Sequence, residues 1–312
     1  MTRRMNSSST KPSHHAPTPL KAVLFASFFV SMGTGVFWNG LSFIADERYG
    51  FSEQKNFILF AVMGVVYMVG ALNAGTITRI VGRWLSPRGV LLLVVLGQAS
   101  LCLIPVLFSG EWTLWCAAIG VTITASLAWP LMESYLTSGR HGQDMRSAIG
   151  WFNIIWTGAV CVPLFLMAPI LENHGEWAIG GLSIINLIGA IPLWWFARQP
   201  GHHDAGLSRE HLSDEYPLLL RSARVLLPLS YVLMSAMTPI LPYRLDEIGV
   251  DVQWKTPATA IWMVVRFFAV IVMWRLKFWH GRWGALLMAG VTMSGGFGLI
   301  VLAPNVTTML SG

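Results

Sequence analysis

The chain has 312 residues, of which 54% are apolar and only 12% are charged. A soluble globular protein carries about 25% charged residues, so this composition excludes an ordinary soluble domain. The net charge of +6 is also found in nucleic-acid-binding proteins, but the placement of the basic residues along the chain excludes that class, as described below.

Nine long stretches of the chain contain almost no charge. Each reaches the roughly 20 residues that a helix needs to cross about 30 Å of hydrocarbon. The sequence therefore predicts an all-α integral membrane protein with about nine membrane-spanning helices. The segment 1–20 before them is rich in Ser, Thr, Pro and His and is expected to be a disordered tail. In chain order the stretches are residues 22–45, 56–78, 89–110, 112–139, 147–171, 177–197, 225–243, 256–274 and 283–312.

The basic residues between these stretches fall on alternate connections. With the N-terminus in the cytoplasm, sixteen Lys and Arg residues lie on the inner side, four lie on the outer side, and Arg266 stands within a stretch. Cytoplasmic loops of membrane proteins are enriched in Lys and Arg. The pattern therefore predicts a cytoplasmic N-terminus and accounts for the net charge without nucleic acid. The four outer residues are Arg48, Lys55, Arg244 and Lys255.

Two short motifs recur about 200 residues apart. Asp46-Glu47 follows the first stretch and Asp246-Glu247 follows the seventh, while Gly-Arg-Trp occurs at 82–84 and again at 281–283. The two motifs recur at almost the same sequence separation, and each copy lies in the corresponding loop. This indicates a unit of six helices that is repeated in the same orientation. Such repeats are typical of secondary transporters, in which the substrate site lies near the membrane midplane between the two repeated units.

This repeat divides the chain into a six-helix N-terminal bundle at 21–197, a cytoplasmic connection at 198–223 and a partial C-terminal bundle of three helices at 224–312. Two complete units would need twelve helices, so three are expected to be missing. Two explanations are open. Truncation is the preferred one, and the other is a shorter protein that dimerises to complete itself.

The loop after the second stretch, Gly75-Thr-Ile-Thr-Arg79-Ile-Val-Gly82-Arg83-Trp84, resembles the signature loop of the major facilitator superfamily of secondary transporters. In that family an Asp in the loop helps a charge network to hold the inward gate shut. Arg79 stands at that position here. The resemblance therefore implies a gating loop of Gly75, Arg79, Gly82 and Arg83 whose charge differs from the family pattern.

Two further segments are similar to this family. Leu241-Pro242-Tyr243 resembles its seventh helix, and the segment from Gly158 to Pro163 is similar to its antiporter motif, with Val162 where a second Gly is usual. The resemblance covers about residues 20–312 and implies a bundle that moves a solute by alternating access.

Two of the apolar stretches hold a single charged residue, Glu133 in the fourth and Arg266 in the eighth. An Arg at the centre of a membrane helix costs about 2.5–3.5 kcal/mol on insertion scales. Arg266 is therefore expected to bind an anionic group or to balance a coupling carboxylate, with a structural ion pair as the alternative. A carboxylate in a low dielectric favours its protonated form, which suits Glu133 to proton coupling. The alternative for Glu133 is an ion pair with Arg140 or Arg146.

Tryptophan and asparagine residues accompany these charges. Trp129 precedes Glu133 by four residues and Trp262 precedes Arg266 by four, so each pair shares a helical face, and Arg266 is placed for a cation–π contact. We expect a solute with hydroxyl, amide or ring groups to pass along these residues, and ordinary packing is the alternative. The predicted lining residues are Trp129, Asn153, Trp156, Trp262 and Asn39.

An embedded enzyme would need His pairs, Asp dyads or a Ser–His arrangement at membrane depth. All eight histidines lie outside the long stretches or at their edges, and the sequence has no nucleotide-binding glycine motif. We therefore expect no enzyme activity, no cofactor and no buried metal site. A weak metal site formed by His202, His203, Asp204 and His211 is less favoured than a solvated loop.

The sequence predicts a multi-pass cell-membrane protein that transports a small solute by alternating access. An ion gradient powers the transport, with protons as the expected ion. The predicted partners are the solute, protons and the lipid bilayer. A truncated protein that transports nothing, or a regulatory remnant, is the alternative.

Overall fold

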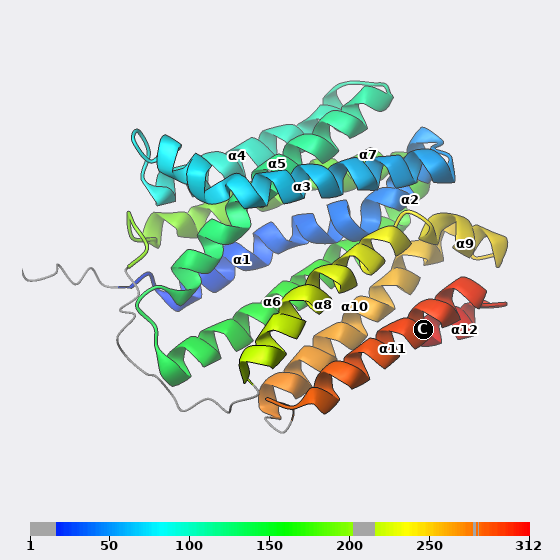
Figure 1. Cartoon of the computed structure of the whole chain (residues 1–312). Coiled ribbons are helices and arrows are strands. Elements are labelled where there is room, and N and C mark those ends of the chain that lie inside the picture. The colour runs from blue at the N-terminus through cyan, green and yellow to red at the C-terminus, as the bar shows by residue number, and fades with distance from the viewer. Residues whose placement is uncertain (1–16, 202–215, 277–278, 280) are drawn as a thin grey trace, which may run out of the picture.

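The computed structural model describes residues 17–201, 216–276, 279 and 281–312, and within these ranges the chain forms helices and no strand. The helices lie side by side along one common direction (Figure 1). Most of the predicted tail and of the predicted connection at 198–223 fall outside the described residues. So do His202, His203, Asp204 and His211 of the weak metal-site alternative.

The helices fall into two groups along the chain. We call α1 to α7 the first bundle and α8 to α12 the second group. The first bundle comprises α1 (Leu20–Gly35), the π-helical segment η1 (Val36–Gly40), α2 (Leu41–Tyr49), α3 (Glu53–Val81), α4 (Pro87–Leu107), α5 (Glu111–Thr137), α6 (Gly142–Met167), η2 (Ala168–Ile170), α7 (Leu171–Ala190) and η3 (Ile191–Trp195). The second group comprises α8 (Tyr216–Met237), α9 (Leu241–Glu247), α10 (Val252–Arg275), α11 (Trp283–Leu302) and α12 (Val306–Ser311).

Local capping fixes where several of these helices begin and end. Ser52 and Ser86 cap α3 and α4, because each hydroxyl accepts a hydrogen bond from the backbone N–H three residues further on. Pro87 occupies the first turn of α4, where its missing N–H costs nothing. Gly50 ends α2 with a left-handed backbone (φ 63°), a conformation that glycine adopts without strain.

Eight helical segments are long and apolar enough to cross a membrane. One of them, Gly142–Trp195, has 54 residues, and it reverses direction near its middle. Its backbone leaves the helical region at His174, and its two ends meet, since Arg140 and Ala197 both hydrogen-bond to Thr18. This segment therefore contains two antiparallel helices, α6 and α7. Each of the nine apolar stretches is mainly helical, which confirms the predicted all-α membrane bundle.

The last apolar stretch is divided into two helices. Pro304 has no backbone N–H to donate and disfavours a helical conformation in the residue before it, and Ala303 is accordingly non-helical. The seventh stretch differs from its predicted bounds as well. Its helix α8 starts at Tyr216, nine positions before the predicted residue 225, and ends at Met237 before the short helix α9.

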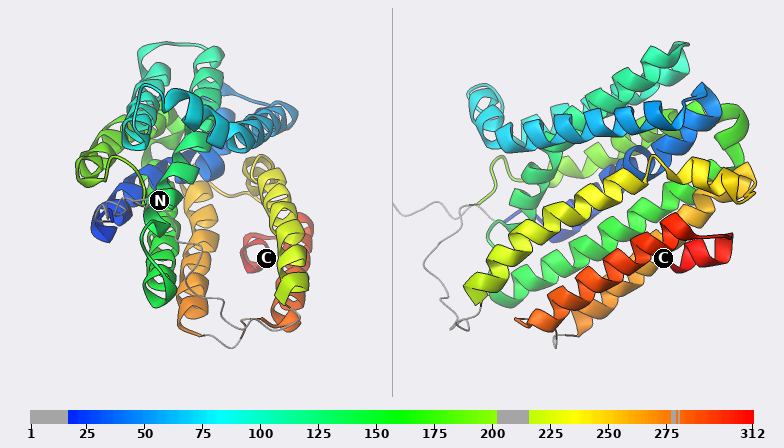
Figure 2. Two further views of the ribbon diagram at one scale, coloured as in Figure 1. Left: turned by 60° about the vertical axis from the view of Figure 1, so that its left-hand side comes forward. Right: turned by 45° about the vertical axis from the view of Figure 1, so that its right-hand side comes forward.

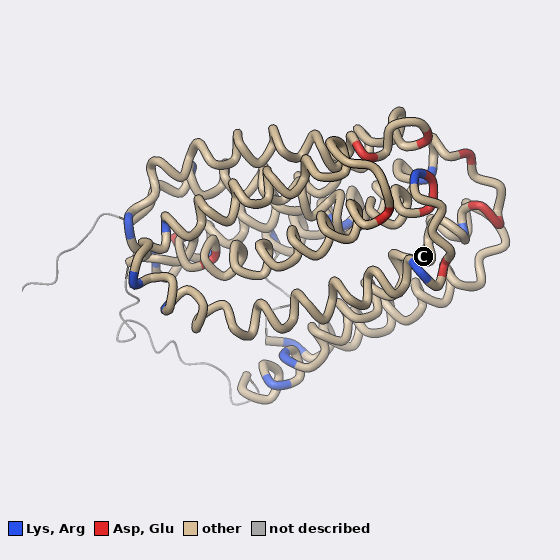
Figure 3. The backbone as a smooth tube through the Cα atoms, turned by 90° about the horizontal axis from the view of Figure 1, so that it is seen from above, with Lys and Arg blue, Asp and Glu red and all other residues tan. Residues whose placement is uncertain are grey.

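Most of the Asp and Glu residues gather at one end of the bundle, whereas Lys and Arg residues lie at both ends (Figure 3). We call the end that carries Arg79, Arg83, Arg88 and Arg140 the basic end, and the opposite end the acidic end. All four basic residues predicted on the outer side lie at the acidic end, where each pairs with a carboxylate. The pairs are Arg48 with Glu176, Lys55 with Glu111, Arg244 with Glu247, and Lys255 with Glu47 and Asp246.

The two groups of helices are packed together at the acidic end. One cluster of buried apolar side chains there combines Phe43 and Leu59 of the first bundle with Leu241 and Leu245 of α9. The buried cluster of the basic end, around Tyr135, belongs to the first bundle alone. Helices α3 and α8 approach each other toward the acidic end and diverge toward the basic end (Figures 1 and 2). Helices α6 and α10 also meet nearer the basic end, where the Trp151 and Trp274 rings lie 5.4 Å apart. The contact between the two groups is thus unequal at the two ends for α3 and α8, but not for α6 and α10.

Candidate functional site

Arg266 of α10 contacts the first bundle through an aromatic ring. Its guanidinium carbon lies 4.6 Å from the centroid of the Trp156 ring on α6. Arg266 is half-buried and forms no ion pair with another described residue. Cation–π contacts are worth about 0.5–1 kcal/mol at exposed sites and about 2 kcal/mol or more where water is excluded. Two predicted site residues from different groups of helices are therefore brought together.

Trp262 does not supply the ring that Arg266 contacts, although it lies one helical turn away on the same helix. It packs against the apolar cluster of the acidic end. Its indole Nε1 is buried and donates to no acceptor among the described residues. Because buried polar groups are normally hydrogen-bonded, this N–H is available to a ligand or a water molecule.

Glu133 lies on α5 and is exposed on the surface of the first bundle. The side chain of Tyr67 on α3 lies within electrostatic range of it, and Tyr67 is in turn within range of Tyr231 on α8. Arg140, one of the two partners considered for Glu133, instead donates to the carbonyl oxygens of Tyr135, Leu136 and Thr18. Glu133 thus lies near α3 of the first bundle, and Tyr67 stands between it and α8 of the second group.

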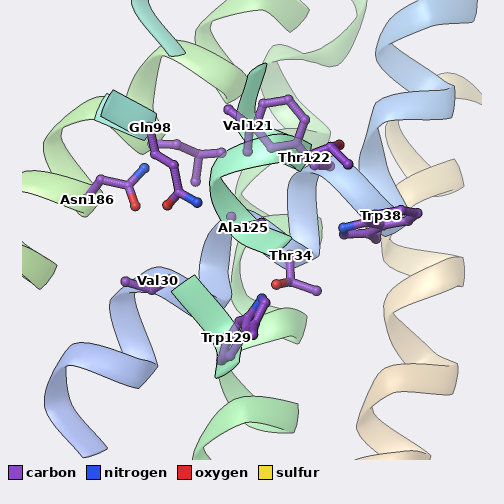
Figure 4. A pocket seen from close by; sticks show the side chains of 12 residues that line it. Val30, Thr34, Trp38, Gln98, Val121, Thr122, Ala125, Trp129 and Asn186 are labelled. Atoms are coloured by element: carbon purple, nitrogen blue, oxygen red, sulfur yellow. The ribbon is translucent and has the colours of Figure 1, made fainter. Parts of the chain in front are cut away.

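A hollow opens inside the first bundle, between helices α1, α4, α5 and α7 (Figure 4). Its inner wall carries three polar side chains that are almost fully buried, Gln98, Thr122 and Asn186, which are 4%, 1% and 3% exposed. The outer wall carries Trp38 and Trp129, which are half-buried. The remaining lining residues are Val30, Gly33, Thr34, Phe37, Val121, Ala125 and Leu182.

Edge-to-face contacts hold the two tryptophans of the hollow in place. The Trp38 ring lies 5.8 Å from that of Tyr67 on α3, at 85°. The Trp129 ring lies 6.2 Å from that of Phe152 on α6, at 80°. Such perpendicular pairs are a preferred aromatic geometry. Trp129 and Trp38 therefore both line this hollow, and the role of Trp129 in a solute route stays a prediction.

The two predicted asparagines lie outside the hollow. Asn39 is in the π-helical segment η1, and its amide donates to the carbonyl oxygen of Thr34 at 3.3 Å. Asn153 is half-buried on α6, and its side chain has no hydrogen-bond partner among the described residues. The residues that line the hollow instead, Gln98 and Asn186, were not singled out from the sequence. The sequence feature that could have identified Gln98 and Asn186 is that each is an uncharged amide within a long apolar stretch.

The acidic end holds a charge cluster that joins the two groups of helices. Lys255 of α10 is 1% exposed and forms ion pairs with Glu47 of α2 and with Asp246 of α9, the latter at 2.7 Å. Its ammonium also lies 3.8 Å from a carboxylate oxygen of Asp46. These carboxylates were read from the sequence only as a repeat landmark. The missed signal is that Lys55 and Lys255 stand at the same offset as the acidic pairs.

Tyr243 of α9 adds neutral hydrogen bonds at the same end. Its hydroxyl donates to the carbonyl oxygen of Phe51 at 2.7 Å and accepts from the Asn56 amide at 3.3 Å. Asn56 in turn donates to the carbonyl oxygen of Ser42 at 2.9 Å.

The predicted gating loop lies at the basic end. Gly75 and Arg79 are in the last turns of α3, and Gly82 and Arg83 follow in the turn toward α4. Arg79 and Arg83 are exposed, and within the described part of the chain neither forms an ion pair. The loop therefore does not link the two groups of helices in this conformation.

Comparison with known protein families gives one match. The family described as Major Facilitator Superfamily matches residues 2–163, which is more than half of the chain and ends within α6. No curated protein matches the chain.

Proposed function

Because the chain belongs to the major facilitator superfamily, we propose that it carries a small solute across a membrane by alternating access, driven by a proton gradient. It is a multi-pass membrane protein. Parallel repeats of six helices in this class place the solute between the two halves, which rock about a fixed site. The proposal assigns these halves to the first bundle and the second group.

The observation that carries the proposal is the unequal contact between the two groups of helices. At the acidic end, Lys255 and Tyr243 bind residues of the first bundle, and apolar side chains of both groups share one buried cluster. At the basic end α3 and α8 diverge (Figure 2). A carrier with two alternating states needs contacts that close one end while the other is open.

The orientation follows from charge. Since cytoplasmic connections are rich in Lys and Arg, we assign the basic end to the cytoplasm and the membrane to the cell surface. The structure then corresponds to a state that opens inward. In this assignment Lys255 belongs to an outer gate, and the loop with Arg79 and Arg83 belongs to an inner gate that is open between α3 and α8 while α6 and α10 remain in contact (Figure 2).

We assign Glu133 to proton coupling and Arg266 to charge balance in the route. Glu133 interacts electrostatically with Tyr67 of α3, which also interacts with Tyr231 of α8. A change in the charge of Glu133 therefore acts next to a contact between the two groups of helices. Arg266 bridges α10 and α6 through Trp156. A solute or proton that alters the interactions of Glu133 or the contact between Arg266 and Trp156 shifts the equilibrium between the inward-open and outward-open states.

Reconstitution tests this proposal. The purified full chain in proteoliposomes, with a pH-sensitive dye inside, is offered a panel of sugars, nucleosides, amino acids and carboxylic acids. A carrier moves at least one solute and couples that movement to protons. Correctly inserted protein that moves none of them supports the alternative of a membrane protein without transport activity.

A further inference from the structure

The hollow of the first bundle contains polar groups that have no partner. Thr122 Oγ1 is buried and makes no hydrogen bond. No side-chain hydrogen bond joins Gln98 or Asn186 to another described residue, although both are at least 96% buried. Buried polar groups in native proteins are almost always hydrogen-bonded to protein, water or ligand. One such buried atom, together with two amides that bond to no other described residue, indicates that water or a ligand completes them.

The arrangement of these groups indicates a single receptor site. Gln98 extends from α4 and Asn186 from α7, and their amide ends point toward one another across the hollow (Figure 4). Each amide offers both an acceptor oxygen and donor N–H groups, and the hydroxyl of Thr122 also offers both. They therefore match a group that donates and accepts on adjacent atoms, such as a hydroxyl pair or a carboxamide.

The charge of the hollow limits what it can accept. None of its lining residues is charged, and Glu133 and Arg266 are not among them. An ionised group would lose its hydration there without gaining an opposite charge, which is strongly unfavourable. The part of a ligand that enters the hollow is therefore uncharged.

The outer wall and the size of the hollow indicate how a ligand lies in it. Trp38 and Trp129 present aromatic surface at the rim, and Trp38 packs against the same apolar cluster as Trp262 of α10. Most of the empty space of the hollow is open to solvent, and its enclosed part is large enough only for a water-sized group, such as one hydroxyl or amide of a ligand. The rest of a ligand would lie outside the enclosed part.

We infer that this hollow is the subsite for the uncharged, hydroxyl- or amide-bearing end of the transported solute. The solute class is a neutral polar ring compound of the sugar or nucleoside kind, with its polar edge on Gln98, Thr122 and Asn186 and a less polar face on the tryptophans. The inference rests on the proposed transport function, because it names the substrate class of that function.

Binding to the purified full chain in lipid nanodiscs tests the inference without requiring transport. The probes are glucose and uridine, together with glucose 6-phosphate and uridine monophosphate as charged counterparts. We expect glucose or uridine to bind, measured by thermal stabilisation and by titration calorimetry, and its phosphorylated form to bind at least tenfold more weakly.

Three variants connect that binding to the hollow. Thr122→Val is nearly isosteric and Gln98→Leu removes an unpartnered amide, so both are expected to fold, and each should weaken the binding about tenfold. Asn73→Leu is the matched control, because Asn73 is exposed on α3 and its amide donates only within its own helix. It should leave the binding unchanged.

The outcomes separate this inference from the proposed function. Binding by neither neutral probe, or binding that Thr122→Val and Gln98→Leu leave unchanged, overturns the subsite and assigns the hollow to ordered water. Proteoliposome uptake of another solute, insensitive to both variants, also overturns the subsite but supports the carrier. Binding that the variants abolish, in a chain that transports nothing, supports the subsite and contradicts the proposed function.

Discussion

The ammonium group of Lys255 on α10 is buried against the carboxylate of Glu47 on α2, although the two residues are 208 positions apart. Each comes from a different group of helices. Asp46 and Asp246 flank the same ammonium, so one lysine balances three carboxylates. Removing its charge leaves the carboxylates to repel one another, and this repulsion acts directly across the contact between the groups.

We therefore expect Lys255→Met to destabilise the acidic end. Breaking a fully buried ion pair costs about 3–5 kcal/mol. Because the Asp246 side chain is 51% exposed, we expect the variant to lose less, about 1–3 kcal/mol of its free energy of unfolding. Thermal unfolding in detergent measures this loss. Lys55→Met is the matched control at the repeated position. Its pair with Glu111 is about 40% exposed on both sides, so its loss should cost only about 0.2–1 kcal/mol.

Opening of the acidic end in the same variant can be measured by cysteine labelling. Thr256 is fully buried beside Lys255, and a cysteine there should react slowly with maleimide in a background without native cysteines. Lys255→Met should raise the labelling rate severalfold, and Lys55→Met should not. Equal rates in all three proteins would show that Lys255 does not hold this end closed.

Arg266→Ala should abolish transport while membrane insertion and folding are preserved. The substitution removes the positive charge and the contact with Trp156. Arg266→Lys should retain part of the activity, because lysine keeps the charge but stacks less well on an aromatic ring. Initial uptake rates in proteoliposomes provide the measurement, with the exposed Arg282→Ala as control. Unchanged uptake by Arg266→Ala would remove this residue from the site.

Glu133→Gln should separate solute movement from proton movement. Glutamine has the size of protonated glutamate but cannot release a proton. We expect the variant to exchange solute across the membrane and to lose accumulation driven by a pH gradient. Dye-reported proton flux and solute counterflow are measured on the same proteoliposomes. Retained proton-driven accumulation would assign the coupling to another group.

Impermeant maleimide labelling of intact cells tests the orientation. Cysteines introduced at Trp112 and Trp254, which are exposed at the acidic end, should react from outside. Cysteines at Arg83 and Arg282 should react only after the cells are permeabilised. Labelling of Arg83→Cys and Arg282→Cys from outside would invert the assignment and contradict the topology on which the transport proposal depends.

Much of the fold could be predicted from hydrophobicity alone. A helix that crosses lipid must be long and uncharged, so each membrane-spanning helix leaves a direct mark in the sequence. The breaks within the stretches are less visible. Pro304 marks one plainly, whereas the π-helical turn at η1 depends on packing against other helices and has no comparable signal.

The site was predicted less completely, because its contacts join distant parts of the chain. Glu133 and Arg266 stood out by their charge, but nothing local indicated that Arg266 contacts Trp156. Gln98 and Asn186 lie 88 positions apart, and their convergence depends on how α4 packs against α7. Lys255 appeared to be a loop charge, since its burial depends on where α2 and α9 meet.

The interruptions in the first and seventh membrane helices give the outer gate small moving parts. The π-helical turn η1 separates α2 from α1, and residues 238–240 separate α9 from α8. The segments beyond these breaks have nine and seven residues, and they carry Asp46, Glu47 and Asp246. Movement of these two short helices displaces far less lipid than tilting of whole membrane-spanning helices. In the proposed orientation, the entrance at the acidic end would open and close by movement of these two short helices while the longer helices stay nearly still.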